Sequence, residues 1–100
     1  MGDYLLLMHH DATDPEAAND PAAWDQYVTN LRKHGVFDGG SAIGEGHAFR
    51  KSGQPGAGGE HLSGYLRLQA ASLDQARSFL SGNPVYEAGG TVEVRELPRD

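Results

Sequence analysis

Apolar residues gather in short segments whose length and alternation predict β-strands. Tyr4–His9 (YLLLMH) is apolar at five successive positions, and proline-containing polar sequence follows it too soon for a buried helix. His61–Gln69 and Thr91–Leu97 alternate between apolar and polar side chains, as half-buried strands do. Val36–Phe49 contains several glycines, so we expect a strand there that is kinked or bulged.

Two amphipathic segments between these strands predict helices. In the first, Asp20 is a good N-cap, Pro21 suits the first helical position, and Gly35 marks the C-terminal end. Its apolar face has helical spacing and consists of Trp24, Tyr27, Val28 and Leu31. The second helix begins at Ser72, and Gln75 completes a capping-box pattern with that residue.

The resulting order, β-α-β-β-α-β, predicts a ferredoxin-like α+β fold for residues 1–100 as a single domain. Its four-stranded antiparallel sheet has both helices on one face, and the Gly/Pro-rich segment Lys51–Glu60 forms an exposed loop. We expect the first and third strands to run in the same direction. His9 and His10 would then lie at the end of the sheet opposite His61.

The first strand is apolar on both faces, which predicts a partner for the side of the sheet that the helices leave uncovered. One face presents Leu5, Leu7 and His9, and the other presents Tyr4, Leu6, Met8 and His10. A lone subunit would expose one of these apolar sets to water. We therefore expect a homodimer in which two sheets face each other and enclose a small-molecule cleft.

Composition excludes several classes of function. The chain has 14 acidic and 8 basic residues, a formal net charge of −6 and no basic run, which argues against binding to nucleic acid or anionic membranes. It has no cysteine, so thiolate catalysis and disulfides are excluded. The longest apolar run, Tyr4–Met8, is far too short to span a membrane or to form a signal sequence. The cytoplasm is the expected location.

The chain resembles the YCII-related protein family. Asn83–Val94 (NPVYEAGGTVEV) is similar to that family's DP-x-x-x-AG…V segment, and YLLLMHHD, HGVFDGGSAIGEG and LSGYLRLQAASLDQA follow its layout over nearly the whole chain. The resemblance implies a ferredoxin-like fold that pairs as a dimeric α+β barrel. It also implies a site in which an Asp that ends the first strand pairs with a His near the start of the first helix.

Asp11 matches the family's aspartate, but Trp24 stands where its histidine is expected. The imidazole would therefore have to come from His10 or His9. An Asp beside a neutral His can orient the ring and stabilise its cation, which suits a general base near pH 7. We take Asp11, His10 and His9 as the candidate catalytic residues; the alternative is an ordinary polar strand end.

Four residues are candidates for holding a ligand. Tyr65 and Arg67 lie in mid-strand on the uncovered face, where they can bind an anionic group or form interface salt bridges with Glu93. Ser41 is expected at the same end of the sheet as the histidine pair. Trp24 is either a ligand contact or part of the core.

A weaker alternative is a metal or anion site at His47 and His61. These residues flank the glycine-rich loop and would face each other if the hairpin pairs symmetrically. A third ligand would have to come from Glu60, Glu45 or a second subunit. Exposed histidines beside a loop are the simpler interpretation.

Together these features predict a small homodimeric protein with a cleft for a small polar or aromatic molecule. If it is an enzyme, we expect acid/base chemistry of a lyase or isomerase type with no organic cofactor. The alternatives are a non-catalytic ligand-sensing or regulatory module and, less favoured, a histidine-based metal-binding protein.

Overall fold

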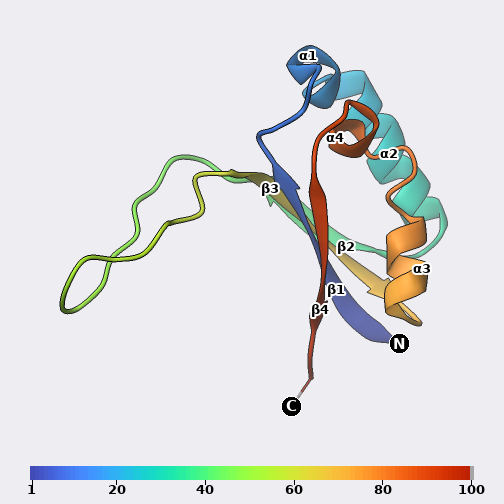
Figure 1. The fold of residues 1–100 in the computed structure, drawn as a ribbon. Helices are drawn as coiled ribbons and strands as arrows, with labels where there is room; N and C mark the ends of the chain where they lie inside the picture. Colours follow the sequence, from blue (N-terminus) through green and yellow to red (C-terminus); the bar gives the residue numbers. More distant parts are fainter. Residues whose placement is uncertain (100) are drawn as a thin grey trace.

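The computed structural model describes residues 1–99 and contains an antiparallel sheet covered on one side by helices (Figure 1). In chain order the elements are β1 (Gly2–His9), α1 (Pro15–Ala18), α2 (Pro21–Lys33), β2 (Phe37–Ala42), β3 (Leu62–Ala70), α3 (Leu73–Ser78), α4 (Pro84–Glu87) and β4 (Val92–Leu97). The four strands are ordered β2-β3-β1-β4. This is the ferredoxin-like arrangement that the sequence predicts.

The expected direction of the third strand is wrong. β1 pairs antiparallel with both β3 and β4, and Leu6 lies opposite Leu66 and Val94. The reason is topological: the crossover through α2 makes β2 parallel to β1, and the hairpin then returns β3 in the opposite direction. The start of β3 therefore lies beside the end of β1, and His61 is at the same end of the sheet as His9.

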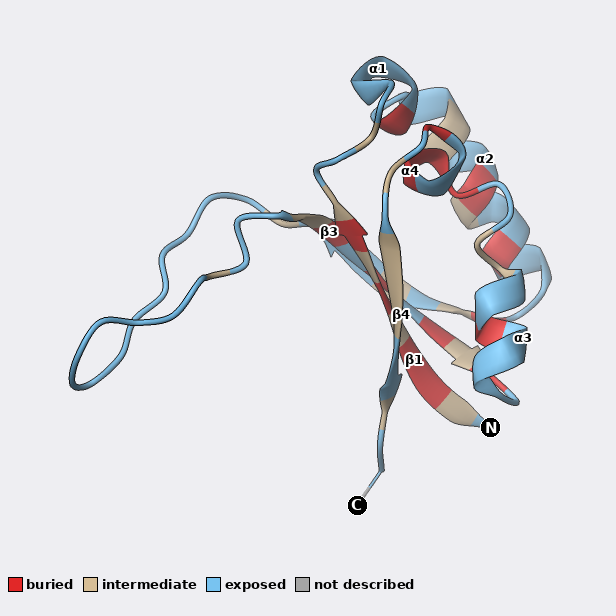
Figure 2. Cartoon of the chain, in the orientation of Figure 1, coloured by how far each residue is buried: buried red, intermediate tan, exposed pale blue. Residues whose placement is uncertain are grey.

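The core lies between the sheet and the helix layer. Leu6 of β1 and Leu68 of β3 are completely buried there, and so is Leu31 of α2, which covers them. Tyr4 and Met8 of β1 are also buried and point to the same face as Leu6. Figure 2 shows buried segments along β1 and on the helices that cover the sheet. No helix among residues 1–99 is long and apolar enough to cross a membrane.

The other side of the sheet, called the open face below, has no helix over it (Figure 1). Strand register places Leu7 beside Tyr65 and Glu93, and Leu5 beside Arg67 and Arg95. Both leucines are only partly buried. Of the two alternatives for β1, the structure therefore places Leu5, Leu7 and His9 on the uncovered side.

Helix boundaries follow from the capping residues. The Asp20 carboxylate accepts a hydrogen bond from the Ala22 amide at 3.1 Å, and Ser72 Oγ accepts one from the Gln75 amide at 3.1 Å, as predicted. The structure adds two short helices that the sequence analysis did not predict, α1 and α4. Each begins with proline, and their N-caps are Asp14 and Asn83.

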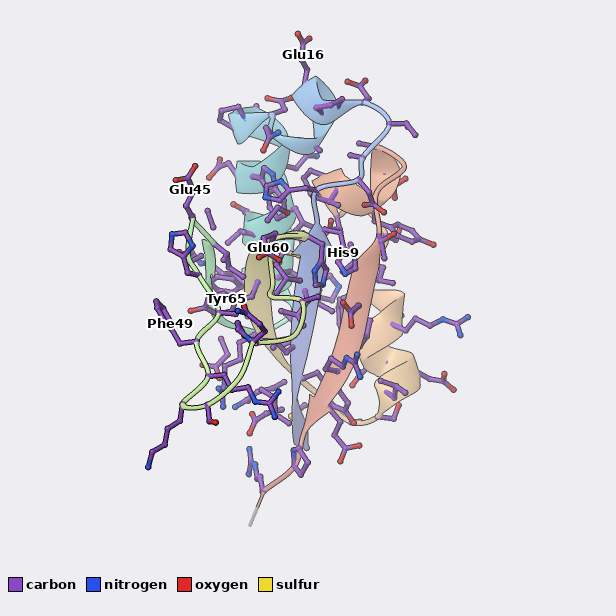
Figure 3. All side chains as sticks on the ribbon, turned by 60° about the vertical axis from the view of Figure 1, so that its left-hand side comes forward. His9, Glu16, Glu45, Phe49, Glu60 and Tyr65 are labelled. Carbon is purple, nitrogen blue, oxygen red and sulfur yellow. The ribbon has the colours of Figure 1, made fainter. Side chains whose placement is uncertain are left out.

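Residues 43–61 form an extended arm that projects from the sheet (Figure 1). β2 ends at Ala42, well before the predicted end at Phe49, and no helix or strand is present within the arm. Gly44 and Gly46 weaken strand formation there because they have no side chain to pack. Phe49 projects from the arm and is 90% exposed (Figure 3).

Candidate functional site

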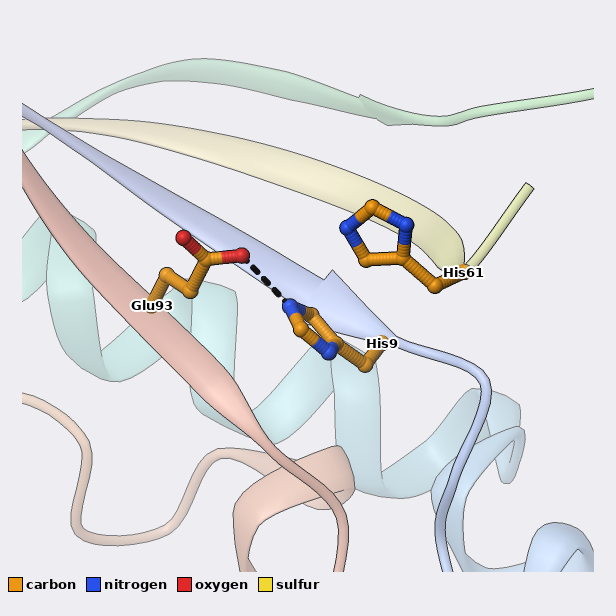
Figure 4. Close-up of side chains that lie close together, drawn as sticks. All are labelled: His9, His61 and Glu93. Atoms are coloured by element: carbon orange, nitrogen blue, oxygen red, sulfur yellow. Dashed lines mark hydrogen bonds and ion pairs between the residues drawn. The ribbon is translucent and has the colours of Figure 1, made fainter. Parts of the chain in front are cut away.

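His9, Glu93 and His61 meet on the open face at the C-terminal end of β1 (Figure 4). His9 Nε2 lies 2.6 Å from Glu93 Oε2, and the His61 ring packs edge-on against the His9 ring with centroids 4.7 Å apart. The side chains of His9 and Glu93 are mostly buried, with exposed fractions of 20% and 26%. His9 comes from β1, Glu93 from β4, and His61 is the residue just before β3.

Backbone hydrogen bonds outside the regular strand pairing position His9 and His61. The His9 amide donates to the Thr91 carbonyl at 3.0 Å, which ties the end of β1 to the start of β4. The His10 amide donates to the His61 carbonyl at 2.8 Å, which fixes the base of the arm beside β1. A register shift between Met8 and His9 interrupts the regular β1–β3 pairing at this point. Such irregularities often redirect a side chain at a functional site.

Asp11 is engaged with Thr91 and not with a histidine. Its carboxylate accepts hydrogen bonds from the Thr91 amide at 2.8 Å and the Thr91 hydroxyl at 2.6 Å. These bonds, with the hydroxyl bond the larger cause, hold the pKa of Asp11 below its ordinary value. Asp11 therefore links the segment after β1 to the residue before β4.

Glu93 is the carboxylate that contacts an imidazole. Its hydrogen bond to His9, and secondly its bond to Arg95, lower the pKa of Glu93. Arg95 Nη2 binds Oε1 at 2.8 Å, which leaves Oε2 for His9. An ionised carboxylate can only accept hydrogen bonds, so the proton between the two side chains lies on His9 Nε2.

His10 and His47 lie elsewhere. The exposed His10 side chain lines a cavity of about 680 Å³ at the base of the arm, together with Glu45, His47 and Glu60. The sequence brings His47 opposite His61 only if the hairpin pairs symmetrically, and the last hairpin hydrogen bond among the described residues joins the Ile43 amide to the Ser63 carbonyl. Beyond that bond the two sides of the arm no longer pair regularly. Among the described residues, the side chains close enough together to share a metal ion are those of His9, His61 and Glu93, and His47 is not one of them.

Arg67 and Tyr65 lie on the open face, as predicted. Arg67 Nε binds the Asp38 carboxylate at 3.2 Å, and its Nη2 lies 3.9 Å from the Asp3 carboxylate. The guanidinium therefore has acidic partners within the subunit, and Glu93 is not one of them. Tyr65 is 37% exposed and lies beside Leu7.

Ser41 lies directly opposite Tyr65 in the β2–β3 pairing. Trp24, Ser41 and Tyr65 all contribute to the lining of one cavity. It has a volume of about 390 Å³, is mostly apolar and lies between α2 and the β2–β3 edge. The Trp24 indole donates a hydrogen bond to the Ala18 carbonyl at 2.7 Å and packs edge-on against Tyr27. Of the four predicted ligand residues, Ser41, Trp24 and Tyr65 therefore line one cavity, and Arg67 is not part of its lining.

The fold and the site together define a ferredoxin-like α+β protein with an imidazole–carboxylate cluster on its open sheet face. No protein-family model matches the chain, and no curated protein matches it. Among solved structures it is similar to 5-chloro-2-hydroxyhydroquinone dehydrochlorinase from Burkholderia phenoliruptrix AC1100, in complex with 2,5-dihydroxybenzoquinone. The TM-score is 0.59 at 15% sequence identity, with 98% of this chain and 95% of the other covered. This likeness confirms the fold.

Proposed function

We propose that the protein is a homodimer that binds a small polar or aromatic molecule beside His9 on the open face and transfers a proton there. The observation that supports this most directly is the 2.6 Å contact between His9 Nε2 and Glu93 Oε2. A carboxylate bound to one ring nitrogen sets the tautomer and stabilises the imidazolium cation. Membership of the YCII-related family and a cytoplasmic location are part of the same proposal.

His9 has the geometry of a general base. Glu93 accepts a hydrogen bond from the protonated Nε2 of His9, so in the neutral ring Nδ1 is a hydrogen-bond acceptor. Nδ1 has no protein partner among the described residues. A bound molecule with an acidic C–H or O–H group within hydrogen-bond distance of Nδ1 can give its proton to the ring. His61, 4.7 Å away between ring centroids, adds a second imidazole beside the same position.

The dehydrochlorinase of similar fold supports the class of substrate. Its name describes an elimination from a chlorinated hydroquinone, and its structure holds a dihydroxybenzoquinone. A small oxygen-bearing ring of this kind suits a site with two imidazoles and a carboxylate. We therefore extend the expectation of lyase- or isomerase-type chemistry to this chain.

A second copy is needed to enclose such a site. Leu5 and Leu7 are partly exposed on the open face and lie next to polar neighbours, including Arg67 and Arg95. A second sheet packed over them would bury the leucines and exclude water from the His9 cluster. Without it the cluster is a shallow surface feature.

The test uses 2,5-dihydroxybenzoquinone, whose ring C–H positions exchange with solvent through proton transfer. We expect the protein to bind it in a calorimetric titration and to accelerate deuterium uptake at the ring carbons in D₂O, as measured by NMR. His9→Ala should abolish the acceleration. His47→Ala, which removes an exposed histidine of the arm, should leave it unchanged.

Two results would overturn the catalytic part of the proposal. One is exchange no faster than in buffer. The other is an equal rate in His9→Ala and the unsubstituted protein. Binding without exchange would favour the non-catalytic ligand-sensing module, which is the alternative function.

A further inference from the structure

We propose that His9, His61 and Glu93 form a binding site for a divalent transition-metal ion of the zinc type, open on one side to an oxygen atom of a small molecule. One ligand atom from each residue can be chosen so that all three lie within 4.8 Å of one another. This deepens the proposed function at the same site, although the proposed function does not require the ion.

The set of side chains suits such an ion. Two imidazoles and one carboxylate form a ligand set used by catalytic zinc sites, which keep a fourth position for water or substrate. The same set with more open positions binds ferrous iron. Calcium and magnesium prefer all-oxygen ligands and are disfavoured here.

Only small movements are needed to bind the ion. Metal–ligand bonds of about 2.0–2.1 Å in tetrahedral geometry put neighbouring ligand atoms about 3.3 Å apart. His9 Nε2 and Glu93 Oε2 are now 2.6 Å apart, so they have to separate by about 0.7 Å. His61 is exposed at the base of the arm, where its ring can turn toward the other two (Figure 4).

The backbone already holds the three ligands in place. His9 is tied to β4 through the Thr91 carbonyl, and the carbonyl of His61 accepts from the His10 amide. Glu93 sits opposite Leu7 in regular antiparallel pairing with β1. The ion would therefore order three side chains but no backbone, which lowers the entropy lost on binding.

The surroundings of the cluster also favour a cation. Arg95 binds the second oxygen of Glu93 and so orients Oε2 toward the ion position, as hydrogen-bonded partners of ligating carboxylates do. Asp11 adds a second carboxylate close enough to His9 for the two side chains to interact electrostatically. Two carboxylates against one guanidinium leave a net negative charge, which partly offsets the double charge of the ion.

The ion would replace the proton on His9 Nε2 that now forms the hydrogen bond to Glu93. In the loaded protein His9 is a ligand, and the acceptor for a substrate proton is the hydroxide formed from metal-bound water, whose pKa falls to about 7 on zinc. The fitting ligand class is a small molecule with an enolate or phenolate oxygen that can replace this water. The location of the chemistry is the same with and without the ion.

The experiment titrates metal-depleted protein with zinc chloride and follows heat and melting temperature. We expect saturable binding of one ion per chain and a higher melting temperature. Glu93→Gln and His61→Ala should each weaken the affinity by about tenfold or more while remaining folded by circular dichroism. His47→Ala and His10→Ala, which remove exposed histidines outside the cluster, should bind zinc as the unsubstituted protein does.

Cobalt(II) gives a second measurement that does not depend on stability. Replacement of zinc by cobalt should produce visible absorption bands typical of four- or five-coordinate nitrogen and oxygen ligation, and His61→Ala should weaken them. The absence of saturable zinc binding would overturn the proposal. So would zinc binding that is lost in His47→Ala or His10→Ala but kept in His61→Ala.

Failure of this proposal can be told from failure of the proposed function. Dihydroxybenzoquinone exchange that depends on His9 and is unaffected by a chelator, with no zinc binding, would remove the metal site and leave the proton-transfer function. Zinc binding without any acceleration of exchange, in either the metal-free or the zinc-loaded protein, would support the metal site and remove the proton-transfer function.

Discussion

His9 and Glu93 meet at 2.6 Å although 84 positions separate them in the chain. The contact exists because β1 and β4 are neighbours in the sheet, with Leu7 opposite Glu93. The site is therefore assembled only after the last strand has paired with the first. Anything that loosens the start of β4 should disturb the site as well as the fold.

Asp11 and Thr91 provide the first test of this dependence. The pKa of Asp11 is lowered, chiefly by the Thr91 hydroxyl, from an ordinary value near 3.8. A carboxyl whose pKa is lower in the folded state adds stability above its unfolded pKa, and this stability is lost as the pH falls through the folded pKa. Thr91→Val should therefore move the acid-unfolding midpoint to higher pH, as measured by melting between pH 2 and pH 7.

Thr13→Val is the matched control for that prediction. The Thr13 hydroxyl also donates a hydrogen bond, to the Ala88 carbonyl at 2.9 Å, but its acceptor does not titrate. Its loss should lower stability by a similar amount at every pH. Parallel pH profiles for the two variants would show that Asp11 is not the group responsible.

Much of the fold could be predicted from local patterns. The helix stripe on α2 with its Asp20–Pro21 start, and the alternation along β3 and β4, give the types and approximate positions of these elements. The short helices α1 and α4 were missed because four residues are too few to show a periodicity. The end of β2 was placed too late because glycines give no signal for where pairing stops.

The site was predicted less well, for a different reason. Alternation along TVEVREL already placed Glu93 on the same face as Tyr65, but its contact with His9 depends on the register between two strands far apart in the chain. The direction of β3 decides where His61 lies, and direction leaves no periodic trace in a sequence. Asp11 lies two residues beyond the end of β1, and its partner, Thr91, comes from the other end of the chain.

Tyr27 gives a prediction for alkaline pH. Burial raises the pKa of Tyr27 to about 12, and its hydroxyl donates a 2.6 Å hydrogen bond to the Phe79 carbonyl. A raised pKa means that its stabilisation is complete below about pH 10, the unfolded value, and is lost as the pH rises through 12. A shift of about two units corresponds to roughly 2–3 kcal/mol.

The measurement for Tyr27 is the free energy of unfolding in urea between pH 8 and pH 12. We expect Tyr27→Phe to lose about 1 kcal/mol at pH 8 through the missing hydrogen bond, and to decline less steeply above pH 10. Tyr86→Phe is the control because the Tyr86 side chain is 48% exposed. An unchanged alkaline slope in Tyr27→Phe would contradict the assignment.

A substitution at Gly40 tests how tightly the β2–β3 edge is packed. A Cβ atom at this position would lie 2.6 Å from Leu66 Cδ2 and 2.6 Å from the Tyr65 carbonyl oxygen, and the backbone atom cannot move aside. Gly40→Ala should cost about 1–3 kcal/mol of unfolding free energy in chemical denaturation. Gly44→Ala is the control because a Cβ there meets nothing within 4 Å. Equal stability of the two variants would show that the edge can relax.

A substitution at Leu5 tests whether a second subunit covers the open face. It lies on the open face between Arg67 and Arg95, so a carboxylate at this position can pair with either guanidinium in a lone subunit but would be buried in a sheet-to-sheet dimer. Light scattering should give twice the 10.7 kDa chain mass for the unsubstituted protein and the single-chain mass for Leu5→Glu. Leu73→Glu, at an exposed leucine of α3, makes the same chemical change outside the sheet and should stay dimeric. A monomeric unsubstituted protein, or a Leu5→Glu variant that remains dimeric, would show that the open face is not the subunit interface and would leave the His9 cluster uncovered by a second sheet.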